Sequence, residues 1–243
     1  MDKLSFTPIK NKKTYLQIVD KILTMVYEGE LEYGDKLFSE PELIKMLNVS
    51  RPTLREALRV LEFLGIVSIG TRSGITINNP QDNINYLPLI YAMLFEKPTN
   101  TDLFELRRAI QVEAAGLAAL RHTEEDRKIL RDIVLKTEAN MKSDHTFFSQ
   151  LDYDFHLAVV NASKNVLSVK LMQTLGELMR RQLLDIIEEL KIENRSRTLK
   201  YHTAICNAII SKDETKSRRI MEEHLSVTYK DIKKKEIIKF TLE

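Results

Sequence analysis

The apolar residues of this chain recur mostly three and four positions apart, which is the period of an α-helix. In the first such stretch, residues 14–28, the apolar side chains fall on one side and predict an amphipathic helix. Two shorter helices should follow, at 39–47 and 51–64. A serine at the start of each can cap the helix, and a proline lies in each first turn, where its missing N–H costs no hydrogen bond.

Two β-branched runs come next, at residues 66–69 and 75–77, with Gly70 and Gly74 between them. This pattern predicts a small β-hairpin with a glycine-rich turn. Three helices followed by a hairpin form a winged helix-turn-helix, and the polar stretch around Pro80 marks its end.

The second helix of the helix-turn-helix has two distinct sides. The side predicted to be buried carries Leu54, Leu58 and Leu61. A separate row at i, i+4 and i+8 consists of Arg51, Arg55 and Arg59. On an arbitrary helix such a row is usually a solvated surface, but this one begins beside Ser50 and Thr53 at the helix N-terminus. Backbone N–H groups and guanidinium groups together favour phosphates and guanine edges, so the row favours DNA.

Residues 37–67, LFSEPELIKMLNVSRPTLREALRVLEFLGIV, resemble the DNA-binding domain of GntR-type bacterial transcription regulators, and the resemblance covers about residues 10–78. It implies that the residues meeting DNA are Ser50, Arg51, Thr53 and Arg55. It also implies a wing that reaches the minor groove and contains Thr71, Arg72 and Gly74. Pro41 stands where this family usually has arginine, so one expected DNA contact is absent and the operator preference can differ.

Length and composition narrow the class of protein. A chain of 243 residues, 43% of them hydrophobic, is long enough for two domains, and few glycines and prolines favour helix. One cysteine and no apolar run of 18 residues argue against a disulfide framework and a membrane span. The basic N-terminus lacks the apolar core of a signal peptide, so we expect a cytoplasmic protein. A net charge of +2 does not itself indicate DNA binding, which is inferred from the motif.

From residue 82 onward the pattern is helical. Seven helices are expected, at 82–95, 101–121, 124–141, 144–162, 165–190, 195–211 and 213–236. The expected fold class is therefore mostly α, with a winged helix-turn-helix at 10–78 followed by an all-α seven-helix bundle. Residues 79–100 should form a linker and the first bundle helix, and residues 101–236 the main helical domain.

Four polar residues in these helices could hold a metal ion. Asp152 and His156 are four positions apart, so they project from one side of a helix. His202 and His224 lie on two later helices, each near the apolar side. A lone histidine is more often a hydrogen-bonded or surface residue, but three imidazoles and one carboxylate together suit a divalent ion. Cys206 follows His202 by four residues, yet a single cysteine in an apolar pattern usually belongs to the core.

The helical region also resembles a known domain. The FCD effector-binding domain of the FadR subfamily is similar to ELRRAIQVEAAGLAAL (105–120), LDYDFHLAVVNASKNVL (151–167), YHTAICNAI (201–209) and MEEHL (221–225). The resemblance assigns the metal ligands to Asp152, His156, His202 and His224. It places Arg107 near the carboxylate of a bound effector. Gln111 stands where family members commonly have glutamate, which alters the charge of the pocket.

Together these observations predict a homodimeric transcription regulator, a repressor that binds a palindromic double-stranded DNA operator and responds to a small organic acid at a metal site. Zinc is the first candidate for the ion, with nickel and manganese as alternatives. Two other interpretations stay open. A metal-free bundle could bind an apolar, acyl-type effector, or a metalloenzyme could be tethered to DNA, although no dedicated general base is evident.

Overall fold

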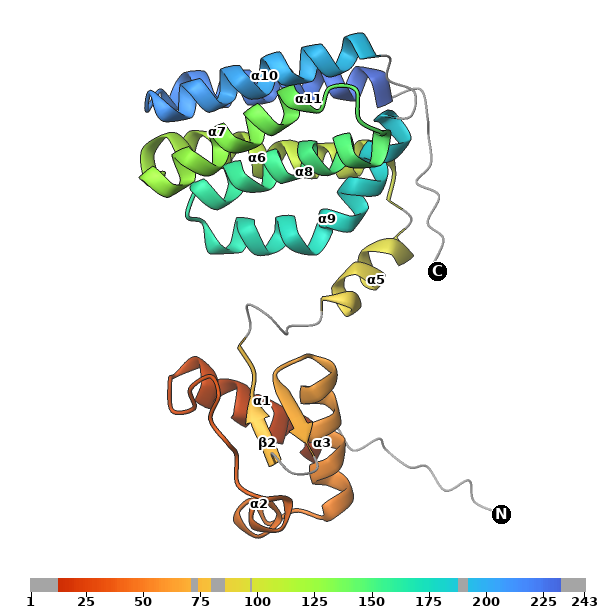
Figure 1. The fold of residues 1–243 in the computed structure, drawn as a ribbon. Helices are drawn as coiled ribbons and strands as arrows, with labels where there is room; N and C mark the ends of the chain where they lie inside the picture. The colour runs from red at the N-terminus through yellow and green to blue at the C-terminus, as the bar shows by residue number, and fades with distance from the viewer. Residues whose placement is uncertain (1–12, 71–73, 80–85, 97, 188–191, 233–243) are drawn as a thin grey trace, which may run out of the picture. The chain divides into compact units, whose positions relative to one another are not determined.

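The computed structural model describes residues 13–70, 74–79, 86–96, 98–187 and 192–232. The chain divides into two compact units, Met1–Pro88 and Leu89–Glu243 (Figure 1).

The first unit has the predicted order of three helices and a hairpin. Its elements are α1 (Thr14–Tyr27), α2 (Glu40–Leu47), α3 (Arg51–Phe63), β1 (Val67–Gly70) and β2 (Gly74–Ile77). The two strands pair antiparallel, with Val67 opposite Ile77 and Gly70 opposite Gly74. The predicted wing residues Thr71 and Arg72 lie outside the described residues, whereas Gly74 begins β2.

The helix-turn-helix begins and ends where its capping residues predict. Ser39 and Glu42 form a capping box at the start of α2, and the Thr53 N–H donates to Ser50 Oγ at the start of α3. Asn48 ends α2 with a positive φ of 49°, which turns the chain sharply between the two helices. These local bonds set the direction in which α3 leaves the turn.

The core of the first unit joins α1, α3 and the hairpin. Its fully buried apolar residues include Leu54, Leu58, Leu61, Val67 and Ile77. The chain before α2 also pairs with β2, because the Leu37 N–H donates to the Ile75 carbonyl at 2.8 Å. The sequence did not predict this pairing, which is a short bridge between Lys36 and Thr76 and is too brief to produce an alternating pattern.

The second unit consists of helices throughout its described part. These are α5 (Leu87–Phe95), which starts just before the boundary, α6 (Asn100–Arg121), α7 (Glu124–Ala139), α8 (His145–Ala162), α9 (Val166–Ile187), α10 (Ile192–Ile210) and α11 (Glu214–Ile232). The predicted seven-helix arrangement is confirmed within the described residues. Parts of three predicted helices, at 82–85, 188–190 and 233–236, lie outside them.

Helix α6 is central to the second unit, where it packs against α8, α9, α10 and α11 (Figure 1). The core between these helices contains large buried side chains such as Phe155, Ile205 and Met221. Cys206 is buried in the same core, as its apolar surroundings predict. Among the described helices, none combines the length with the apolar composition needed to span a bilayer.

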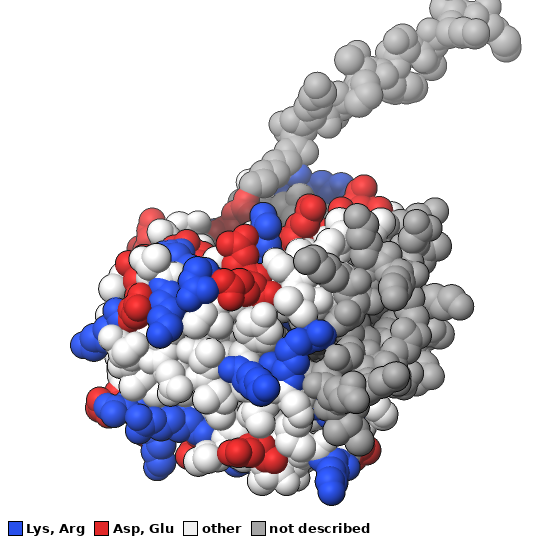
Figure 2. All heavy atoms as spheres, turned by 90° about the horizontal axis from the view of Figure 1, so that it is seen from above, with Lys and Arg blue, Asp and Glu red and all other residues white. Residues whose placement is uncertain are grey.

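Charged side chains of both signs are interspersed on the face of the molecule drawn in Figure 2, and the described residues form no broad patch of one sign there. This agrees with the small net charge of the chain. The overall surface charge therefore does not indicate where a functional site lies, and the site has to be identified from particular side chains.

Candidate functional site

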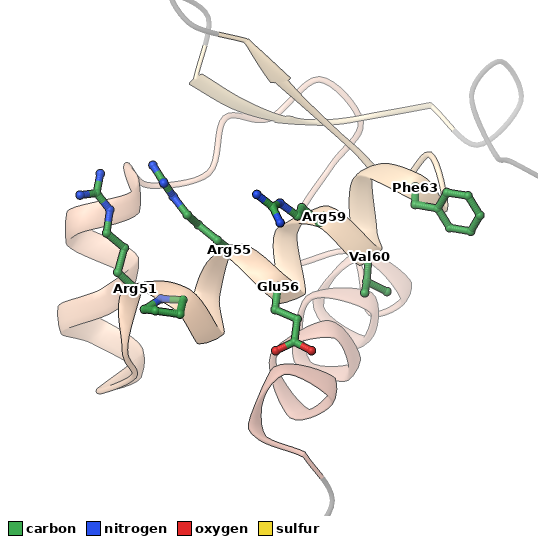
Figure 3. Close-up of a pocket in the computed structure, with 7 residues that line it drawn as sticks. Arg51, Arg55, Glu56, Arg59, Val60 and Phe63 are labelled. Carbon is green, nitrogen blue, oxygen red and sulfur yellow. The ribbon is translucent and has the colours of Figure 1, made fainter.

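The exposed side of α3 carries the arginine row that the sequence predicts. An open depression of about 750 Å³ is lined by Arg51, Pro52, Arg55, Glu56, Arg59, Val60 and Phe63. Figure 3 shows the three arginines extending to one side of the helix, with Glu56 and Val60 on the other. The opposite side of the same helix is fully buried at Leu54, Leu58 and Leu61. The buried leucines thus orient the helix so that its arginines face solvent.

The arginines near the start of α3 share an acidic neighbour that the sequence analysis missed. Glu40 Oε2 accepts a hydrogen bond from Arg55 Nε at 3.1 Å and lies 3.5 Å from Arg51 Nε. Both arginine side chains are at least half exposed, which leaves their outer nitrogen atoms accessible. Glu40 lies in the first turn of α2. Its contacts with α3 were not predicted, because the local spacing of residues does not show which side chains of two helices meet.

Ser50 and Thr53 lie at the N-terminus of α3, where their hydroxyl groups are 2.7 Å apart. The exposed Gly74 has a φ of +79°, a conformation that side chains other than glycine rarely adopt. The predicted DNA-contacting residues within the described part of the chain therefore lie on the start of α3 and on the start of β2.

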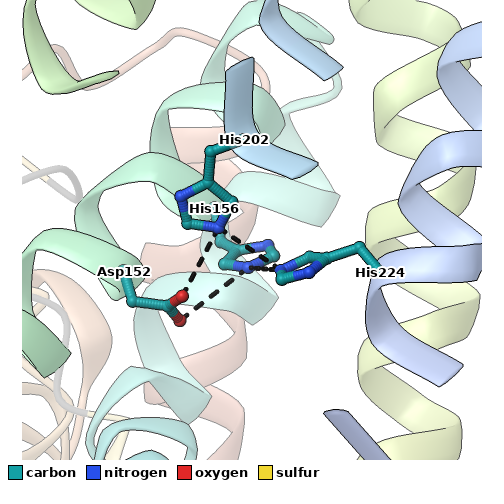
Figure 4. A group of neighbouring side chains, drawn as sticks. All are labelled: Asp152, His156, His202 and His224. Carbon is teal, nitrogen blue, oxygen red and sulfur yellow. Dashed lines mark hydrogen bonds and ion pairs between the residues drawn. The ribbon is translucent and has the colours of Figure 1, made fainter. Parts of the chain in front are cut away.

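In the second unit, the four predicted metal ligands converge from three helices. Asp152 and His156 project from α8, His202 from α10 and His224 from α11 (Figure 4). All four are buried, and one potential ligand atom from each lies within 4.8 Å of the others. The convergence brings together residues up to 72 positions apart in the sequence.

The spacing of these atoms fits a single metal ion. His224 Nε2 lies 3.2 Å from His156 Nε2 and 3.3 Å from His202 Nε2. Asp152 Oδ1 lies 3.4 Å from His202 Nε2. Ligands bound to one ion at about 2.1 Å are separated by about 3.0 to 3.4 Å, depending on the coordination geometry. The four side chains could therefore hold a divalent ion without large movements.

The charge states also suit metal binding. Burial lowers the pKa of each imidazole, and the neighbouring positive charges lower it further, to about 3 for His224. Burial raises the pKa of Asp152 to about 6, and the charge of Arg107 opposes that rise. Near neutral pH the cluster thus offers three neutral imidazoles and one carboxylate, which is the state that a metal ion requires.

Arg107 lies on α6, is only 2% exposed and interacts electrostatically with Asp152 and with His156. Its Nε has no hydrogen-bond partner among the described residues. A buried guanidinium group with an unpaired N–H is costly and favours an anion. Its position beside the cluster agrees with the role that the sequence resemblance implies.

Two other contacts, which the sequence analysis did not identify, position the ligands. The Arg195 side chain of α10 donates to the carbonyl oxygens of Met141 and Ser143, at 3.1 and 2.7 Å, and thereby holds the connection before α8. The ring of Phe155 stacks on His202 with their centroids 3.9 Å apart. Together they link α10, which carries one ligand, to α8, which carries two.

Comparisons with known proteins agree with both units. Residues 14–77 match the gntR family of bacterial regulatory proteins, and residues 102–227 match the FCD domain. The chain is similar to the HTH-type transcriptional regulator LutR of Bacillus subtilis, with 31% identity over 209 residues that cover 83% of this chain and 93% of LutR.

Two further relatives also match most of the chain. The Glc operon transcriptional activator of Escherichia coli K12 is 28% identical over 224 residues, which cover 88% of this chain and 87% of the activator. A solved structure, Streptococcus agalactiae GntR, has a TM-score of 0.68 and 27% identity and covers 89% of this chain and 99% of its own. These relatives are transcription regulators rather than enzymes. The chain therefore belongs to the GntR family of DNA-binding transcription regulators, with an N-terminal GntR helix-turn-helix and a C-terminal FCD effector domain of the FadR type.

Proposed function

We propose that this regulator is a cytoplasmic homodimeric repressor whose operator affinity is lowered by a small organic acid bound beside a metal ion. The observation that carries the proposal is the buried cluster of Asp152, His156, His202 and His224, with Arg107 next to it. A cluster of polar side chains inside a helical core favours an effector that is an organic acid bound beside a metal ion. It disfavours an apolar effector, because buried polar groups require partners.

The ion would be held by Asp152, His156, His202 and His224, and zinc fits three imidazoles and one carboxylate. When bound, it supplies positive charge that attracts a carboxylate. Arg107 would donate hydrogen bonds to the same carboxylate and fix its orientation. Nickel and manganese accept similar ligands, so the available metal decides between them.

On DNA, we assign the major-groove contacts to Ser50, Arg51, Thr53 and Arg55, and the wing contacts to Thr71, Arg72 and Gly74. Support comes from the exposed arginine row and from the N-terminus of α3, where N–H groups favour phosphate. A single winged domain buries a small interface, so we expect two subunits to bind the half-sites of a palindrome.

Thermodynamic linkage couples effector binding in the helical domain to operator binding by the winged domain. If the acid binds preferentially to one arrangement of the helical domains, and the operator to another, each ligand weakens the binding of the other by the same factor. A coupling free energy of about 1–3 kcal/mol would change operator affinity by roughly 5- to 150-fold.

The first test is elemental analysis of the purified, untagged protein beside the Asp152→Ala, His202→Ala double variant. We expect about one divalent ion per chain in the parent and little in the variant. An equal metal content in both proteins would contradict the assigned ligands. It would leave the family assignment unchanged.

The second test measures operator binding by fluorescence anisotropy, with zinc present and with each of a panel of small organic acids. An acid that stabilises the protein against heat should also weaken operator binding. If every acid that binds leaves operator affinity unchanged, the proposed coupling is wrong. A reporter gene that falls in expression when the regulator is deleted would identify an activator instead of a repressor.

Arg55→Ala tests the DNA assignment. It should weaken operator binding by about 1–3 kcal/mol if Arg55 makes a bidentate contact to a base. An equal loss of affinity for the operator and for random DNA would restrict Arg55 to a phosphate contact.

A further inference from the structure

Glu40 places a negative charge beside two arginines that we assign to DNA, itself a polyanion. Glu40 is the first residue of α2, and its Oε2 accepts a hydrogen bond from Arg55 Nε at 3.1 Å. The same oxygen lies 3.5 Å from Arg51 Nε. The side chain of Glu40 is 25% exposed, whereas those of Arg51 and Arg55 are 64% and 51% exposed. One carboxylate oxygen therefore contacts two arginines that are one turn apart on α3.

The start of α2 contains two carboxylates with different partners. Glu42 belongs to the capping box of its own helix, where its Oε2 accepts a hydrogen bond from the Ser39 N–H at 2.9 Å. Pro41, between the two glutamates, restricts the backbone of this turn. Glu40 has no part in the capping box, and its carboxylate extends to α3 instead. The cap thus fixes the backbone from which Glu40 reaches the arginines.

The contact with Glu40 engages the inner nitrogen of each guanidinium group. A guanidinium group has five N–H donors, of which one is on Nε and four are on the two outer nitrogens. The commonest base-specific contact in the major groove is a bidentate one, in which an arginine donates to guanine O6 and N7. An arginine that is held at Nε can therefore present its outer nitrogens to guanine and still keep its contact with Glu40.

The carboxylate also affects the alternatives that these arginines have on DNA. An arginine with a free side chain can turn to a phosphate, and phosphate contacts carry no sequence information. Glu40 holds the two side chains in one orientation, and its negative charge repels a phosphate that approaches the same nitrogens. Exposed ion pairs stabilise a fold only slightly, so a role in folding does not account for this arrangement.

We propose that Glu40 is a positioning residue that sets sequence selectivity by holding Arg51 and Arg55 for contacts with guanine and disfavouring their contacts with phosphate. This inference rests on the proposed function, since it assumes that both arginines enter the major groove. Arg51 and Arg55 are separated by about 6 Å along the helix, which corresponds to about two base pairs of DNA. Because one carboxylate holds both side chains, selectivity at the two base pairs depends on the same residue.

The test measures the base preference of the full-length protein at each position of a duplex. Selection from a library of random-sequence DNA gives the duplex that the parent prefers. Fluorescence anisotropy then compares it with duplexes in which one G·C pair is replaced by A·T, and Arg51→Ala and Arg55→Ala identify the pair that each arginine reads. At these two pairs, replacement should cost the parent about 5- to 150-fold in affinity.

In Glu40→Ala, the cost of replacing either of these two pairs should shrink by about 2- to 12-fold, which is the effect of releasing an ordered side chain. Replacements at the other base pairs should keep their cost. A merely structural role for Glu40 would change the overall affinity and would not single out the two base pairs that the arginines read.

Glu40→Gln and Glu56→Ala are matched variants. Glutamine keeps an acceptor oxygen without the charge, so Glu40→Gln should retain more of the preference than Glu40→Ala. Equal losses in the two variants would contradict a positioning role. Glu56 is on α3 itself, but its side chain extends away from the arginines, so Glu56→Ala should leave every base preference unchanged (Figure 3). Thermal unfolding of each variant controls for folding.

The remaining outcomes separate this inference from the proposed function. If Glu40→Ala keeps the full preference at both base pairs, or loses preference equally at every base pair, the role of Glu40 is refuted and the arginine contacts stand. If neither Arg51→Ala nor Arg55→Ala changes any base preference, the proposed major-groove contacts fail and the inference fails with them.

Discussion

Replacement of Asp152 by asparagine should have opposite effects on stability in the absence and presence of zinc. Asp152 is 4% exposed, and burial raises its pKa to about 6 despite the charge of Arg107. Asparagine keeps the size of the side chain and removes its charge. Without a metal ion the change relieves an unfavourable buried carboxylate, whereas with a metal ion it removes a ligand.

The magnitude follows from the pKa. A carboxyl group whose pKa rises from 3.8 to about 6 on folding destabilises the folded state by about 3 kcal/mol at pH 7.5. This destabilisation is complete above pH 6 and disappears as the pH falls towards 3.8, because the group is then protonated in both states. In EDTA at pH 7.5, Asp152→Asn should be more stable by up to about 3 kcal/mol, or roughly 6–12 °C in midpoint temperature.

Zinc should reverse the order. A ligand present at 1,000 times its dissociation constant stabilises the folded state by about 4.1 kcal/mol, which exceeds the advantage of the variant in EDTA, and the variant should lose most of that gain. The assay is thermal unfolding followed by circular dichroism, in EDTA and in zinc, between pH 4 and pH 8. Asp154→Asn, on the same helix but outside the cluster, is the control and should show neither effect.

Two results would refute this reasoning. If Asp152→Asn is less stable than the parent in EDTA, the carboxylate is a stabilising partner of Arg107 and not an unfavourable buried charge. If zinc stabilises the variant and the parent equally, Asp152 is not a ligand. If Asp152 had only a structural role, Asp152→Asn would change the stability in the same direction in EDTA and in zinc.

Three further predictions concern other contacts. Glu40→Ala removes the carboxylate next to Arg51 and Arg55, so anisotropy measured against salt should show tighter binding to random DNA and a log–log slope steeper by about one. Glu56→Ala, whose side chain extends to the other side of α3, should give a smaller change (Figure 3). Gln111→Glu would place a carboxylate one turn from Arg107, and calorimetry should detect weaker binding of every acid because that carboxylate competes for the guanidinium group. Gly116→Ala would drive a methyl group into the Arg218 side chain, which pairs with Glu113 and Glu214, and urea unfolding should show a loss of about 1–3 kcal/mol. In an Arg218→Ala background the same substitution should be neutral or stabilising, because alanine favours helix over glycine.

Most helix boundaries of the fold were predictable, because the signals that set them are local. Ser39 with Glu42, and Ser50 with Thr53, close the first turns of α2 and α3 by bonds that span three residues. The apolar period of the chain likewise predicts which side of each helix is buried. The pairing of Lys36 with Thr76 was not predictable, since the two residues are 40 positions apart and the bridge is isolated.

The candidate metal site was predictable in part. Asp152 and His156 share a side of α8 by helical spacing alone, so their proximity needs no tertiary information. His202 and His224 were candidates because each lies near the apolar side of its helix, and the resemblance to the FCD domain assigned them to the same ion. Only the packing of α8, α10 and α11 brings His224 Nε2 to 3.2 Å from His156 Nε2 and to 3.3 Å from His202 Nε2. The contact of Glu40 with Arg55 likewise depends on the packing of two helices and was not predictable from the sequence.

The sequence by itself therefore determined the family, the order of the helices and the wing, and the residue types available for DNA and for a metal ion. These properties follow from motifs and spacings within a few turns of helix. Only the tertiary structure decided which polar groups are buried together, and burial is what raises the pKa of Asp152, keeps the imidazoles neutral and leaves Gln111 Oε1 without a donor. The physical reason is that desolvation and hydrogen-bond satisfaction depend on every neighbour a side chain has, and most of those neighbours come from distant helices.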